Sequence, residues 1–281
     1  MKARAQATVL LAPALGVLLL LVAVPQVVML VASFGRRSIH GGIVRDFTLS
    51  NYVRVMDPLY LGVLGRSLVF AALTTAVCLA VGYPLAYWLA RRAPPGARKA
   101  LLVLVILPFW TSFLVRMYAW VVLLRTEGVV NTTLETLGLP AMNILYTDLA
   151  VVLGQVYGEL PFMVLPLFAS LEKLDTSLTD AAADLGARPA QVFRRVVLPL
   201  TRPGIVAGSL LVFVPSLGAF LSPDLLGGGR TAYFGNLVQS QFAVARDVPF
   251  GAALSSVVAL LVLALLLVGR RPLSEASHAA G

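Results

Sequence analysis

Six long apolar runs dominate the sequence and restrict the folds open to it. Together they cover 138 of the 281 residues and hold only three charged side chains. The hydrocarbon core of a bilayer is about 30 Å thick, and about 20 apolar residues cross it as a helix. We therefore expect an all-α integral membrane protein, with residues 1–281 in a single transmembrane domain. The six expected transmembrane helices are 8–33, 67–90, 100–124, 149–169, 204–226 and 251–269.

The charge content excludes a water-soluble globule. Only 12% of the residues are charged, whereas soluble domains have about a quarter. The segments between the apolar runs hold 32 charges in 143 residues, which is an ordinary solvated composition. A net charge of +9 favours a nucleic-acid partner in a soluble protein. Here the excess of Lys and Arg lies mostly in segments on one side of the expected membrane, so we expect no nucleic-acid partner.

Lys and Arg are enriched in the cytoplasmic segments of membrane proteins, and this bias sets the expected orientation. With both termini inside, the inner segments hold 13 Lys and Arg in 62 residues, and the outer segments hold 8 in 81. We therefore expect a multi-pass protein with both termini cytoplasmic. The first run has 26 residues, which is too long for the apolar part of a cleaved signal. The outer loop 34–66 is an exception, because its five arginines are more than an outer segment is expected to contain. Its length indicates a small outer subdomain.

Eight prolines lie inside the expected transmembrane helices. Each removes a backbone donor and disturbs the preceding turn, which hydrocarbon tolerates only where protein or a wet cavity satisfies the freed carbonyls. Such breaks line substrate paths in transporters, and they also occur as ordinary packing kinks. Two glycine pairs at four-residue spacing, Gly154/Gly158 and Gly204/Gly208, would allow helices to approach closely.

The segment 170–203 is the longest inner connection and has a helical pattern of its own. A first helix capped by Asp175 or Thr176 is expected to stop at Gly186, which supplies a left-handed residue. A second helix over 189–198 begins with a proline in its first turn and ends at the next proline. We therefore expect a cytoplasmic helix–Gly–helix loop. It is either a solvated connector or, as its apolar residues favour, a docking surface for a soluble partner.

The spacing within this loop resembles the EAA signature of permease subunits in binding-protein-dependent ABC importers. In that family the short helix of the loop enters a groove of the ATPase subunit and carries its closure into the membrane. Asp180 stands for the usual Glu, and Arg188 stands where relatives often have a small capping residue. The resemblance implies a type I ABC importer permease-like fold with this segment as its coupling loop. The ATPase-coupling residues it implies are Asp180, Ala181, Ala182, Leu185, Gly186, Leu198 and Pro199.

Three further segments are similar to spermidine/putrescine permeases, namely Pro108–Arg116, Leu160–Leu167 and Ser222–Gly229. The resemblance implies a bacterial inner-membrane permease that imports a small cationic solute, with another small solute as the alternative. It implies three kinds of partner besides the lipid bilayer itself. They are a second permease chain, related but distinct, two ATP-binding ATPase subunits and an extracytoplasmic substrate-binding protein. At Ala219 many polyamine permeases have an acidic residue instead.

The three charges inside the apolar runs are Arg116, Glu159 and Asp224. Each needs an explanation, because a charge at mid-bilayer costs about 2.5 to 3.5 kcal/mol. Counted along the helices, Arg116 and Glu159 lie at similar depths with opposite sign. Two interpretations are possible. Either the two residues form a structural ion pair, or Glu159 faces the substrate path and contacts a cationic substrate. Asp224 is either an interfacial turn residue or a carboxylate at an outer gate.

Aromatic side chains could complete a path for ammonium groups, because each cation–π contact adds about 0.5 to 2 kcal/mol. One helical face of the fourth run joins Gln155 and Glu159 to Phe162 and Pro166. Other aromatic residues near the outer interface serve the path or form an interfacial belt. The candidate substrate-path residues are Glu159, Asp224, Tyr157, Phe162, Trp110 and Arg116.

The sequence lacks the motifs of an ATP-binding site and of a metal site. It has no Gly-x-x-x-x-Gly-Lys-Ser/Thr phosphate loop, so we expect no ATPase site or catalytic residue here, with ATP and Mg bound by the partner subunits. Neither His40 nor His278 has ligand-type neighbours at metal spacing, so we expect no metal and no cofactor. An intramembrane hydrolase using Glu159 and Asp224 is disfavoured by their different depths. A membrane scaffold leaves the ordered inner loop unexplained.

Overall fold

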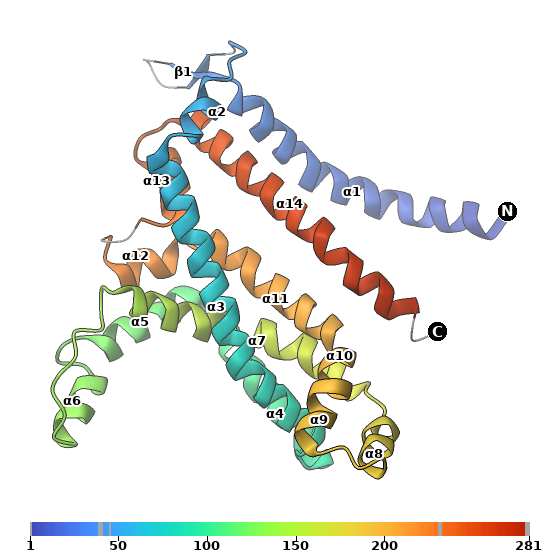
Figure 1. The fold of residues 1–281 in the computed structure, drawn as a ribbon. Coiled ribbons are helices and arrows are strands. Elements are labelled where there is room, and N and C mark those ends of the chain that lie inside the picture. The colour runs from blue at the N-terminus through green and yellow to red at the C-terminus, as the bar shows by residue number, and fades with distance from the viewer. Residues whose placement is uncertain (1, 39–41, 45, 230–231, 279–281) are drawn as a thin grey trace. The chain divides into compact units, whose positions relative to one another are not determined.

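The protein is helical apart from one short hairpin, in a computed structural model that describes residues 2–38, 42–44, 46–229 and 232–278 (Figure 1). His40, and Arg45 of the five arginines in the 34–66 segment, lie outside the described residues. The chain divides into two compact units. One contains residues 1–62 and 237–262, and the other contains residues 63–236 and 263–281.

Four described helices are long and apolar enough to cross a membrane, and two bent helix pairs bring the number to as many as six. The four are α1 (Lys2–Ser33, apolar from Leu11), α3 (Pro58–Arg91), α7 (Asp148–Glu172) and α14 (Val248–His278, apolar to Leu267). The all-helical membrane class expected from the apolar runs is confirmed.

The first unit contains the segment expected to form an outer subdomain as far as Gly62. After α1 the chain forms a hairpin of β1 (Arg36–Arg37) and β2 (Ile43–Val44), followed by α2 (Ser50–Val55). The strands are antiparallel, with Arg36 opposite Val44. Asn51 of α2 donates hydrogen bonds to the backbone oxygens of Ser33 and Gly35, so the end of α1 is tied to α2. The unit also includes most of α13 (Phe234–Ala243) and the first half of α14.

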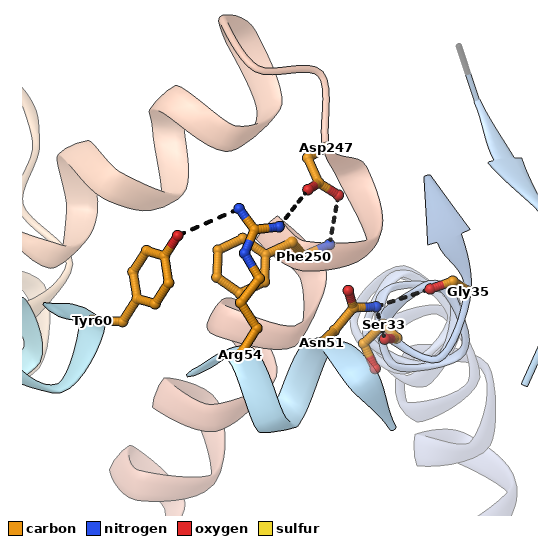
Figure 2. A network of polar contacts seen from close by, with 7 residues as sticks. All are labelled: Ser33, Gly35, Asn51, Arg54, Tyr60, Asp247 and Phe250. Atoms are coloured by element: carbon orange, nitrogen blue, oxygen red, sulfur yellow. Dashed lines mark hydrogen bonds and ion pairs between the residues drawn. The ribbon is translucent and has the colours of Figure 1, made fainter. Parts of the chain in front are cut away.

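Arg54 joins the outer subdomain to the start of α14 (Figure 2). Its guanidinium donates to the Asp247 carboxylate at 2.8 Å and lies over the Phe250 ring, 3.8 Å from the ring centroid. The other Asp247 oxygen accepts from the Phe250 backbone N–H. Three arginines of the 34–66 segment have carboxylate partners, in the pairs Arg36–Asp46, Arg54–Asp247 and Arg66–Asp148. The unexpected basic content of this loop is therefore partly neutralised by local acids.

The second unit is built around α7. Helices α5 (Phe113–Leu124), α11 (Arg202–Leu217) and α12 (Leu221–Gly227) pack against it. Two of the glycines in the four-residue pairs make this packing close. A Cβ on Gly204 of α11 would lie 2.6 Å from the Ser170 Cβ of α7, and one on Gly154 of α7 would overlap Leu226 of α12. At Gly204 the Pro166 carbonyl oxygen would also be 2.8 Å away, so only hydrogen fits there, whereas a larger residue at Gly154 would require the Leu226 side chain to move.

Two of the expected transmembrane helices are broken. The run 100–124 forms α4 (Pro95–Ile106), a 3₁₀ turn η1 (Leu107–Trp110) and then α5, with a 90° bend at the break. The run 204–226 forms α11 and α12, separated by residues 218–220. Proline lies in or just before each break, since Pro108 is in η1 and Pro215 is in the last turn of α11. A helix α6 (Val129–Thr136) follows α5.

The inner loop forms α8 (Thr176–Asp184), α9 (Pro189–Val192), a π-helical segment η2 (Phe193–Val197) and α10 (Leu198–Leu200). The expectation that Pro199 ends the second helix is wrong, because helical structure continues through Leu200. Pro199 comes two residues after the π-helical segment, near the end of a helical stretch that runs without interruption from Pro189 to Leu200. A bend of 64° follows at Thr201, between α10 and α11.

Candidate functional site

A cavity of 250 Å³ lies inside the second unit, where the broken helix α11–α12 meets α7. Residues from α5, α7 and the 218–220 break contribute to its wall. The lining residues are Phe113, Gln155, Glu159, Pro215, Gly218, Ala219, Phe220, Leu221 and Ser222. The cavity therefore combines a carboxylate, an amide and a hydroxyl with aromatic and apolar surface.

Glu159 is the charged residue of this wall. It is one helical turn after Gln155 on α7, so both side chains project from the same face. The Gln155 amide donates to Glu159 Oε1 at 3.1 Å, while Glu159 Oε2 has no hydrogen-bond partner. The residue is only 7% exposed. A buried carboxylate oxygen without a partner is costly, and in a cavity it is available to a ligand.

Ser222 fixes the orientation of Gln155. Its hydroxyl donates to Gln155 Oε1, which turns the amide nitrogen of Gln155 toward Glu159. Ser222 comes from α12, beyond the break in the fifth apolar run. A short chain of hydrogen bonds thus runs from α12 through Gln155 to the carboxylate.

Arg116 lies among aromatic rings rather than in an ion pair. Its guanidinium carbon is 5.1 Å from the Phe109 ring centroid, 5.4 Å from that of Phe113 and 6.0 Å from that of Tyr157. It is near enough to act electrostatically on Glu159. No nitrogen–oxygen contact between the two is within ion-pair distance, although both are among the described residues. The Nε and Nη1 atoms of Arg116 are buried without hydrogen-bond partners.

The other predicted path residues lie outside the cavity lining. Phe162 packs edge-to-face on Phe109, and Tyr157 packs in the same way on Trp120. Trp110 is 83% exposed, beside the bend between η1 and α5. Asp224 is exposed on α12, and the Asn236 amide donates to it at 3.4 Å. The structure thus brings Glu159, Arg116 and Tyr157 together and leaves Trp110 and Asp224 apart from them.

The inner loop is a second candidate site, and its shape is determined locally. The Asp175 carboxylate accepts from the Ser177 backbone N–H at 2.9 Å and caps α8. This hydrogen bond holds the pKa of Asp175 below its usual value. Gly186 follows α8 with φ +83°, and a Cβ there would meet no atom within 4 Å. Backbone conformation, not space, requires glycine at this position.

The start of α9 is capped from within the helix. The side-chain oxygen of Gln191 accepts from the backbone N–H of Arg188 at 2.8 Å. The Arg188 side chain has no acceptor, and the Gln191 backbone N–H donates to the Arg188 carbonyl at 2.8 Å. Asp180 and Ala181 are exposed, and Ala182 is half-buried. Leu185 is 89% exposed, which is unusual for an apolar residue without a partner. Leu198 and Pro199 are half-buried.

Several cavity residues were not predicted from the sequence, among them Ser222, Phe113 and Phe220. The sequence does contain a signal for them, because Gly218 follows Pro215 inside an apolar run and so indicates a break in the helix. Within the described part of the chain, no group of three His, Cys, Asp or Glu residues is placed to hold a metal ion.

Comparisons with known proteins show the family to which this chain belongs. A family model described as "Binding-protein-dependent transport system inner membrane component" matches residues 82–271. The spermidine/putrescine transport system permease protein PotB of Escherichia coli (strain K12) is 45% identical over 255 residues, covering 90% of this chain and 92% of that protein. PotB of Haemophilus influenzae is 43% identical over 253 residues, covering 89% of this chain and 87% of that protein.

A solved structure has a similar fold. A chain in the crystal structure of a bacterial alginate ABC transporter, in complex with an alginate pentasaccharide-bound periplasmic protein, matches with a TM-score of 0.75. It is 19% identical, and the match covers 95% of this chain and 93% of that chain. The resemblance read from the sequence is confirmed. The chain belongs to the family of binding-protein-dependent transport system inner membrane components, as a multi-pass permease subunit of an ABC importer.

Proposed function

We propose that this chain forms part of the translocation path for a small cationic solute, and that the solute is a polyamine. One observation carries the proposal, namely the unpartnered oxygen of the buried Glu159 carboxylate in a cavity of 250 Å³. An ammonium group would supply the missing hydrogen-bond donors and the opposite charge in one step. The names of the relatives, spermidine/putrescine permeases, support the same solute.

The aromatic surroundings favour a cation. Phe113 and Phe220 line the cavity. The Phe109 and Tyr157 rings lie beside the Arg116 guanidinium. Aromatic faces attract ammonium groups by about 0.5 to 2 kcal/mol each. Arg116 would then place a fixed positive charge near Glu159, and Tyr157 and Phe162 would support the aromatic surroundings from outside the cavity lining. Trp110 and Asp224 would contact the solute outside this cavity.

The inner loop would couple this path to ATP hydrolysis on other subunits. Its exposed residues, above all Leu185, would dock on an ATPase. We propose a complex with two ATPase subunits that bind ATP and Mg, a second and distinct permease chain, and an extracytoplasmic binding protein. This chain would have no ATPase site and no cofactor of its own. The Lys and Arg distribution supports cytoplasmic termini and a cytoplasmic loop.

Transport assays of the whole complex in proteoliposomes test the proposal. Radiolabelled spermidine and putrescine, presented with the cognate binding protein, should accumulate in an ATP-dependent manner. A neutral sugar and an oxyanion serve as controls and should neither accumulate nor compete. Accumulation of a control solute without polyamine uptake would contradict the proposed substrate.

One observation favours a second candidate, the import of another small solute by the same machinery. Ala219 lines the cavity at the position where many polyamine permeases have an acidic residue. The cavity then offers a single carboxylate, which suits a solute with one cationic group. Competition by monoamines as strong as that by putrescine would favour this candidate.

A further inference from the structure

We propose that Tyr83 of α3 is a positioning residue that transmits movement of the inner loop to the transmembrane helices. The inference rests on the proposed function, since it assigns the route by which ATPase movement reaches the path. Tyr83 lies in the second unit with the loop and is 8% exposed. Its side chain contacts the π-helical segment η2 and the bend that follows, which are the two irregular parts of the loop's second half.

The irregular geometry of this half indicates an adjustable element. The segment Phe193–Val197 is π-helical, and a 64° bend follows at Thr201, four residues after Val197. A π-helical turn is rare, and in proteins it is frequently found at functional sites. The regular helices α8 and α11 on either side can each move as a rigid body. Displacement of the loop is therefore expected to concentrate between Phe193 and Thr201.

Tyr83 contacts both ends of this stretch. Its ring meets the Phe193 ring edge-to-face, with centroids 5.6 Å apart. Its hydroxyl is 2.9 Å from Thr201 Oγ1, and Thr201 is fully buried. The Thr201 hydroxyl in turn is bonded to the Val197 carbonyl at 2.9 Å, which uses its only hydrogen. Tyr83 is therefore the donor, and the chain of bonds runs from α3 through Thr201 to the last residue of η2.

The same helix also holds the beginning of the loop. Arg91, two turns after Tyr83 on α3, donates to the Leu174 carbonyl at 2.8 Å, just before α8. Both ends of the loop are thus attached to one transmembrane helix. A loop displacement must either carry α3 with it or break a buried hydrogen bond, and the second outcome leaves a buried polar group unpaired. Movement of α3 is the favoured outcome.

The chain offers a matched pair of variants. Tyr83→Phe keeps the ring against Phe193 and removes the hydroxyl. Tyr87→Phe is the control, because Tyr87 also packs edge-to-face on Phe193, at 6.1 Å, and its hydroxyl has no hydrogen bond among the described residues. Thr201→Val removes the same hydrogen bond as Tyr83→Phe from the other side.

The experiment measures the number of ATP molecules hydrolysed per solute molecule imported, in the reconstituted complex. Tyr83→Phe and Thr201→Val should raise this ratio about threefold or more, with normal complex recovery. The double variant should be no worse than Thr201→Val alone, because that variant has already lost the bond between Tyr83 and Thr201. Tyr87→Phe should leave the ratio unchanged.

Two outcomes overturn the inference. In the first, Tyr83→Phe has the wild-type ratio. In the second, recovery of the complex and solute uptake both fall while the number of ATP molecules hydrolysed per solute stays constant. That result would mean that Tyr83 has a purely structural role. The proposed function is tested separately, by uptake in the wild-type complex, so its failure is visible before any variant is compared.

Discussion

The cavity beside Glu159 and the inner loop that contains Gly186 belong to the same compact unit, yet they satisfy their polar groups in opposite ways. In the loop, each capping group finds its partner two or three residues away, as Asp175 does with Ser177 and Arg188 with Gln191. In the cavity, the polar groups come from helices far apart in the sequence, and one carboxylate oxygen stays unpartnered.

This difference indicates how each region is used. A loop whose backbone hydrogen-bonding groups are satisfied by its own residues has a fixed shape before a partner binds. Recognition then depends on that shape and on exposed apolar residues such as Leu185. A buried polar group without a hydrogen-bond partner destabilises the fold until a ligand supplies that partner. The loop should therefore be sensitive to backbone changes, and the cavity should be sensitive to the loss of single polar atoms.

The largest expected effect comes from Glu159→Gln. The substitution removes the charge and keeps the shape, so uptake at low solute concentration should fall about tenfold or more. Complex recovery should be unchanged. Uptake in proteoliposomes and co-purification with the ATPase measure the two quantities. Glu135→Gln, at an exposed carboxylate on α6, is the matched control and should change uptake less than about twofold.

Two results would contradict that prediction. Unchanged uptake would remove Glu159 from the path. A complex that no longer assembles would mean that Glu159 and Arg116 act together as a structural pair.

The next effect is at Gly186. An alanine there must adopt a left-handed conformation at a cost of about 1–2 kcal/mol, which should distort the loop and reduce ATPase co-purification severalfold. Gly138→Ala is a stringent control, because Gly138 has φ +73° and open space around a Cβ, but lies outside the loop. If both variants lose the ATPase equally, the effect is general instability and the loop has no special role.

A smaller effect is expected from Ser222→Ala, which removes the hydrogen bond that orients Gln155. A neutral hydrogen bond contributes about 0.5–1.5 kcal/mol, so KM for the solute should rise a few-fold while the maximal rate changes little. Steady-state uptake kinetics check this. A fall in the maximal rate at constant KM would place Ser222 in the movement of α12 and not in the cavity.

The smallest effect concerns the cap of α8. Because the pKa of Asp175 is lowered in the folded loop, its contribution is present above the ordinary Asp pKa and is lost as pH falls through the lowered value. Hydrogen exchange of the Ser177 amide should therefore be slow, after correction for the intrinsic pH dependence, at neutral pH and accelerate below about pH 4.

Two variants check the role of the Asp175 carboxylate. Asp175→Ala should exchange quickly at every pH, and Asp175→Asn, which also caps helices, should exchange slowly without the pH dependence. Equal exchange in all three proteins would show that the cap does not stabilise α8.

The local features of the sequence were predictable. The cap at Asp175, the left-handed Gly186 and the helix–Gly–helix loop follow from residues within one or two turns, and all are present. The similar depth of Arg116 and Glu159 followed from helix geometry. Their relation did not, because Arg116 lies among aromatic rings from η1, α5 and α7. Side-chain pairing between helices depends on rotation and bend angles that no single segment specifies.

The sequence by itself determined the all-helical membrane class, since a bilayer requires apolar helices whose backbone bonds are internal. It also determined the loop and, through its motifs, the family. Only the tertiary structure decided where the third and fifth apolar runs are broken, that Ser222 contacts Gln155 across the second break, and that Tyr83 contacts Thr201. The reason is physical, because apolar content specifies that a segment is buried, while the contacts between buried segments depend on how helices bend and pack together.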